Sequence, residues 1–134
     1  MWATKQITVT KGTTRNSPVE QEMQLSLGTI ERVFIFFPPG PMGYVKVTLV
    51  HYEHQFLPED PEAYITGDDY VFDLPMNKEI KDHPSVKVVA WNTATTYDHT
   101  ITVGVFLREK ALVSKISQAV KSLFGMAGQT VEIE

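Results

Sequence analysis

The chain has 134 residues, of which 43% are hydrophobic and 21% charged, a composition typical of one folded globular domain and unlike that of a disordered chain. Its formal net charge is −4 and its 12 lysines and arginines are scattered, which argues against a nucleic-acid partner because neutralising phosphates requires clustered basic residues. It contains no cysteine, which excludes disulfides, thiolate metal sites and a cysteine nucleophile.

The first residues lack the long apolar run of a secretory signal, and no stretch of about 20 apolar residues could span a bilayer. We therefore expect synthesis in a cytoplasm without Sec export, and no membrane partner.

Residues 1–108 predict a series of short strands separated by segments rich in glycine, proline and small polar residues. Alternating apolar residues predict strands at 5–10, 23–27, 44–52, 70–74, 86–91 and 100–107, with shorter pieces around 55–57. The run from Ile30 to Phe37 is strand-length and rich in β-branched and aromatic residues, which predicts a strand that is apolar on both faces. The segments 11–21, 38–43, 53–69, 75–84 and 92–98 are predicted to be loops or polar connections.

This pattern gives about seven or eight strands with no helix between them, which favours an all-β antiparallel sandwich or a jelly roll. The long and uneven loops favour the jelly roll. We expect residues 1–108 to form this domain, with a short N-terminal arm, and residues 109–134 to form a C-terminal helical arm.

The tail has a different periodicity. Residues 109–124 predict one amphipathic helix that ends at Gly125, with an apolar stripe formed by Leu112, Val113, Ile116, Ala119, Val120, Leu123 and Phe124. Such a helix can pack on its own domain, bind a second protein or another copy, or lie on a membrane. Its polar side carries only Lys115 and Lys121 as charges, which favours a protein partner over a membrane surface.

Two groups of polar residues suggest site chemistry, and neither pattern is specific. His51 and His54 would point to opposite faces of a continuous strand, so they converge only if the strand ends near Tyr52, and no metal site is expected. The acidic residues Glu59, Asp60, Glu62, Asp68 and Asp69 could act as a glycosidase pair or hold calcium, but they lack EF-hand spacing and an orienting basic group, and a solvated loop is the simpler interpretation. No nucleophile, phosphate-binding or dinucleotide motif is present, so no catalytic residue, cofactor or metal is assigned and the protein is expected not to be an enzyme.

Four aromatic residues could form a ligand platform: Tyr64, Tyr70, Trp91 and Tyr97. Sugar-binding modules stack ligands on such rings, which gives the alternative function of a carbohydrate-binding β-sandwich module. The other interpretation of Trp91 is that it caps the core with its N–H group satisfied.

The segment from Ile30 to Leu107 resembles small β-sandwich, jelly-roll-like structural and decoration proteins in the virions of tailed phages. The resemblance lies in residues 28–33, 37–40, 53–58, 67–69, 91–92 and 99–103. It implies a non-enzymatic component of a virus particle, either a capsid decoration or a neck or tail accessory, made in the host cytoplasm and located in the virion. The implied partners are further copies of the chain and other virion proteins, and a small-molecule ligand is not favoured.

The tail lies outside that resemblance, so its role is inferred from its own residues. We expect the arm residues Leu112, Ile116, Val120, Leu123 and Phe124 to lock the domain to neighbours, with Trp2 as an anchor at the other end of the chain.

Overall fold

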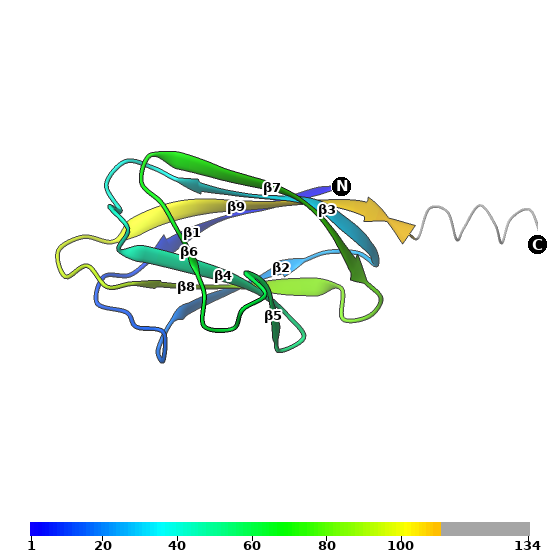
Figure 1. Ribbon diagram of the computed structural model, residues 1–134, viewed down its shortest axis with the longest axis horizontal. Coiled ribbons are helices and arrows are strands. Elements are labelled where there is room, and N and C mark those ends of the chain that lie inside the picture. Colours follow the sequence, from blue (N-terminus) through cyan, green and yellow to red (C-terminus); the bar gives the residue numbers. More distant parts are fainter. Residues whose placement is uncertain (111–134) are drawn as a thin grey trace, which may run out of the picture.

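The computed structural model describes residues 1–110, which form two antiparallel β-sheets packed face to face (Figure 1). Sheet A contains, in spatial order, β1 (Trp2–Val9), β9 (His99–Glu109), β3 (Gly28–Phe37) and β7 (Tyr70–Ile80). Sheet B contains β2 (Val19–Gln24), β8 (Ser85–Asn92), β4 (Val45–His51) and β5 (His54–Leu57), and the short β6 (Ile65–Thr66) also pairs with β4. The predicted all-β sandwich is thereby confirmed. From Ala111 onward the predicted helix lies outside the described residues. The same is true of the arm residues Leu112, Ile116, Val120, Leu123 and Phe124.

The strand pairs are nested in the sequence. β4 pairs with β5, β3 pairs with β7, β2 pairs with β8 and β1 pairs with β9, so each pair encloses the one before it. Two further pairings, β3 with β9 and β4 with β8, join these hairpins into the two sheets.

The core lies between the sheets and is built from alternate residues of each strand. On β3 the inward side chains of Val33, Ile35 and Phe37 are fully buried. A β-bulge between Ile30 and Arg32 adds one residue to β3, so Ile30 and Val33 both point inward although they are three positions apart. Each such buried side chain contributes roughly 1.5–3 kcal/mol relative to an exposed one.

Three strands begin or end three or more residues away from a predicted boundary in a way that reassigns a segment. β1 begins at Trp2 rather than residue 5, and the N–H group of Leu107 donates to the carbonyl of Met1 at 2.8 Å, so residues 1–4 are part of sheet A rather than an arm. β2 begins at Val19, inside the segment predicted as a loop. β7 continues through Pro75 to Ile80, where a polar connection was predicted. β7 is an edge strand, and an edge position tolerates the missing N–H group of a proline.

The two ends of the sandwich differ. One end carries the longer loops 10–18, 38–44 and 93–98 together with the turn 67–69, and we call it the loop end. The other end carries the short connections 25–27, 52–53 and 81–84, the start of β1 and the end of β9, and we call it the turn end (right side of Figure 1). Over residues 1–110, no helix has the length and apolar character needed to cross a membrane.

Candidate functional site

The outward side of sheet A carries a cluster of apolar side chains, which we call the outer aromatic face. It consists of Trp2 on β1, Phe34 and Phe36 on β3, Val71 on β7 and Phe106 on β9. The sheet register places Trp2 opposite Phe106 and places Phe36 opposite Val71. The ring centroid of Trp2 lies 4.9 Å from that of Phe106 and 5.9 Å from that of Phe34.

Three of these side chains are exposed to solvent, and Phe34 and Phe106 are half-buried. Trp2 is 54% exposed, Val71 50% and Phe36 37%. The inward residues of β3 form the core, so Phe34 and Phe36 lie on the opposite face of the strand, outside that core. A contiguous apolar patch on the surface of a soluble domain typically marks an interaction site.

The sequence singled out Trp2 as an anchor but did not predict its neighbours. The structure places Trp2 inside strand β1 rather than on a free arm, where it contacts two other aromatic rings. The apolar run in β3 was the signal in the sequence for this cluster. A strand with apolar residues on both faces has one face for the core and a second apolar face for another contact.

The four residues of the predicted ligand platform do not come together. Trp91 is only 5% exposed, since Tyr64 packs edge-on against it at 5.8 Å and the guanidinium of Arg15 lies 5.0 Å from its ring centroid. Tyr70 and Tyr97 are exposed near the loop end, and no ring–ring contact within the described part of the chain joins them to Trp91 or Tyr64.

The loop 58–64 covers Trp91, and hydrogen bonds from the side chains of Arg15 and Gln55 hold this loop in place. Arg15 donates to the carbonyls of Pro61 and Glu62, each at 2.6 Å, and to that of Ala63 at 3.1 Å. Gln55 donates from Nε2 to three carbonyls of the same loop. Trp91 therefore lies on the outward side of sheet B, beneath an ordered loop.

Two of the predicted acidic residues shape the backbone. Oδ1 of Asp60 accepts the N–H group of Glu62 at 3.0 Å. Oδ1 of Asp68 accepts the N–H groups of Gly40 and Met42 at 2.8 and 3.0 Å, which joins two loops of the loop end. Within residues 1–110, no group of three or more histidine, aspartate or glutamate side chains could hold a metal ion.

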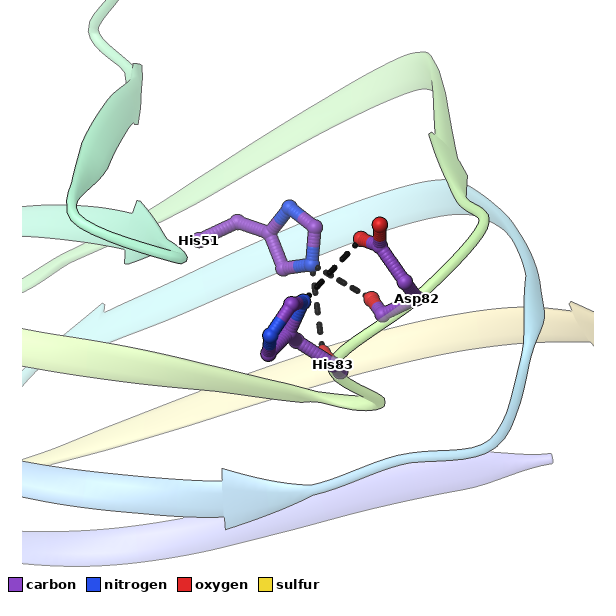
Figure 2. Close-up of polar contacts among 3 residues, drawn as sticks. All are labelled: His51, Asp82 and His83. Carbon is purple, nitrogen blue, oxygen red and sulfur yellow. Dashed lines mark hydrogen bonds and ion pairs between the residues drawn. The ribbon is translucent and has the colours of Figure 1, made fainter.

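A second polar cluster lies at the turn end (Figure 2). His51 is buried, and its Nε2–H group donates to the carbonyls of Asp82 and His83 at 3.0 and 3.2 Å. Nδ1 of His83 lies 3.2 Å from Oδ1 of Asp82, and the ring of His83 stacks on Tyr52 with centroids 3.8 Å apart. His51 therefore ties the loop between β7 and β8 to the end of β4.

This cluster borders a shallow hollow of about 290 Å³, lined by residues that include Glu22, Glu53, Tyr52 and Lys87. β4 ends at His51 and β5 begins at His54, so the two histidines form a direct pair across the turn, but His54 is exposed. Sequence reasoning missed the contact between Tyr52 and His83 because it joins two connections that are far apart in the chain.

Comparisons with models of protein families, with curated proteins and with solved structures found no match to this chain.

Proposed function

We propose that this chain is a non-enzymatic structural protein of a virus particle, a capsid decoration or a neck or tail accessory of a tailed phage. It assembles with further copies of itself and with other virion proteins through its β-domain and its C-terminal arm, and it is located in the virion. The observation that carries the proposal is the outer aromatic face, an apolar surface built on four strands of one rigid sheet.

The strand order supports the finer description of the fold as a jelly roll. Nested pairing of β1 with β9, β2 with β8, β3 with β7 and β4 with β5 is the arrangement produced when one long hairpin is rolled into two sheets of four strands. Jelly rolls are common in viral capsid proteins, and they also occur in lectins and cupins. The burial of Trp91 beneath an ordered loop weighs against the use of its ring as a sugar platform.

A repeated component of a particle must be soluble before assembly and must offer matching surfaces afterwards. The outer aromatic face supplies one such surface on the domain, and the apolar stripe of residues 112–124 supplies a second. The carboxylates of Asp60 and Asp68 are engaged with backbone N–H groups, which favours a structural role for the acidic loop over a catalytic one.

The test is the mass of the full chain by light scattering over a concentration series. We expect a discrete oligomer, and we expect the double substitution Ile116→Lys with Val120→Lys to shift it toward the monomer. The matched control, Gln118→Lys with Ser122→Lys, adds the same charge to the polar side of the predicted helix and should leave the oligomer intact. A chain that stays monomeric at every concentration contradicts the assembly part of the proposal.

The virion part of the proposal has its own test. Mass spectrometry of purified particles of the virus that encodes the chain should detect its peptides in a fixed ratio to the major capsid protein. Absence from the particles contradicts a virion location whatever the oligomeric state.

A further inference from the structure

The outer aromatic face has dimensions that restrict what can cover it. It extends from the pair Trp2 and Phe106 to the pair Phe36 and Val71. Phe36 also pairs with Thr102, so the face spans the four residue steps of β9 from Thr102 to Phe106, or about 13 Å along the strands. A narrow apolar strip of similar length would cover it.

The tail of the chain contains such a strip. The stripe from Leu112 to Phe124 covers 12 residue steps, or about 18 Å if those residues are helical. It consists of aliphatic side chains that end in one aromatic residue, and a helix over this segment would place the lysines and serines outside the stripe. Packing the stripe on the outer aromatic face would remove both apolar surfaces from water at once.

The direction in which the chain leaves sheet A favours a neighbouring copy as the acceptor. Glu109 is still paired with Gly28, and the N–H group of Lys110 donates to the carbonyl of Leu27 at 2.9 Å. The chain therefore leaves at the turn end, seven residues of β9 beyond Thr102, which is about 23 Å from the position of Phe36. To reach Phe36 and Val71 on its own domain it would have to reverse direction sharply.

The sequence after β9 lacks the strongest turn-forming residues. Residues 109–124 include no glycine, proline, asparagine or aspartate, and the first glycine is Gly125. This composition favours a chain that continues away from its own domain over one that folds back onto it.

We infer that the outer aromatic face of one copy binds residues 111–124 of a second copy. The inference rests on the proposed function, since it names the contact through which the chain assembles. A reciprocal exchange of arms between two copies gives a closed two-fold dimer, and an exchange in one direction gives a ring or a filament.

The absence of cysteine allows a direct test in the full chain, because any introduced thiol is unique. The variants Val71→Cys and Ile116→Cys are prepared separately, mixed and oxidised mildly. A mixed disulfide, identified by linked peptides that contain residues 71 and 116, is expected to be at least tenfold more abundant than the 24–116 disulfide in a control mixture of Gln24→Cys with Ile116→Cys. Gln24 is an exposed residue of β2 in sheet B, away from the outer aromatic face.

A second variant gives an independent measurement. Phe36→Glu should weaken self-association at least tenfold by light scattering without lowering the urea midpoint by more than the control. The control is Thr8→Glu, which places the same charge at an exposed outward position of β1 outside the cluster.

Two disulfide results overturn the inference. If Val71→Cys with Ile116→Cys in one chain forms an internal disulfide at monomer mass while the mixture does not crosslink, the arm covers its own domain. Crosslinking at the control level in every sample means that the arm does not bind this face.

Light scattering on the unmodified chain separates the two proposals. If the unmodified chain forms an oligomer but the cysteine variants crosslink no more than the control mixture, the proposed function stands and this contact is excluded. A monomer at all concentrations removes both.

Discussion

The ring of Phe34 on β3 lies directly against Gly104 on β9, its partner in the register of sheet A. A methyl group on Gly104 would overlap three atoms of that ring. Glycine inside a strand costs about 0.5–1 kcal/mol relative to alanine, and here the space it leaves is filled by an aromatic side chain that also contacts Trp2. The glycine therefore positions Phe34 within the outer aromatic face.

Gly104→Ala should lower the free energy of unfolding by about 1–3 kcal/mol, because the new methyl group displaces the Phe34 ring and disrupts its packing on Trp2. In a Phe34→Ala background the same change should raise stability by about 0.5–1 kcal/mol, since only the backbone effect remains. Urea unfolding of the four proteins in this cycle measures both values. Equal changes in the free energy of unfolding in the two backgrounds would show that the position of the Phe34 ring does not depend on Gly104.

Asn92→Asp should be among the most damaging isosteric changes in the domain. Asn92 is fully buried, and its Nδ2 group donates to the carbonyls of Val9 and Tyr97 at 3.1 and 3.0 Å. Aspartate replaces this donor with an oxygen that faces two carbonyls, which should cost about 2–4 kcal/mol. Chemical denaturation measures the loss, and Asn77→Asp on the exposed side of β7 is the control. Similar midpoints for the two variants would contradict the assignment of these hydrogen bonds.

Glu53→Gly should stabilise the protein by about 0.5–1 kcal/mol. The connection between β4 and β5 consists of Tyr52 and Glu53, with φ of 45° and 66°, so both residues adopt the left-handed conformation of a type I′ turn. Glycine adopts that conformation without strain, and this substitution leaves the stack of Tyr52 on His83 in place.

The control for the turn is Glu22→Gly, which puts the same residue into strand β2 and should cost about 1 kcal/mol. Thermal and urea unfolding distinguish the two. A loss of stability in both variants would show that the strained turn at Glu53 is not relieved by glycine.

Arg15→Met should expose Trp91 to solvent. The substitution removes the three hydrogen bonds that hold the loop 58–64 and the cation above the indole ring. In a Trp2→Phe background Trp91 is the only tryptophan, so a red shift of the emission maximum and stronger acrylamide quenching report on its cover. Arg108→Met is the control, because Arg108 is exposed on sheet A, where it pairs with Glu31 of the same sheet, whereas Trp91 lies on sheet B. Unchanged emission in the Arg15 variant would mean that other contacts keep Trp91 covered.

His51→Phe should lower the free energy of unfolding by about 1–2 kcal/mol, because the carbonyls of Asp82 and His83 lose their common donor. His54→Phe changes the exposed partner across the same turn and should stay within about 0.5 kcal/mol of the unmodified chain. Urea denaturation measures both variants. A larger effect at His54 would contradict the role of His51 as the tie between the two connections.

The sequence by itself determined the fold class and the central strands. β4 and β8 were predicted to within a residue or two, because alternation of apolar and polar residues is a local property of a strand with one buried face. The apolar run of β3 was also predicted to have two apolar faces. For the candidate site, the sequence indicated Trp2 and the stripe of the tail.

Only the tertiary structure decided which residues surround them. Trp2, Phe34 and Phe106 belong to three strands that are far apart in the chain, and they meet because β9 lies between β1 and β3. The extension of β7 through Pro75, the early start of β1 and the burial of Trp91 beneath the loop 58–64 depend likewise on pairing partners and covers supplied from elsewhere. Hydrogen bonding across a sheet and packing on its surface are long-range interactions. The local periodicity of a strand does not specify which other strands become its neighbours.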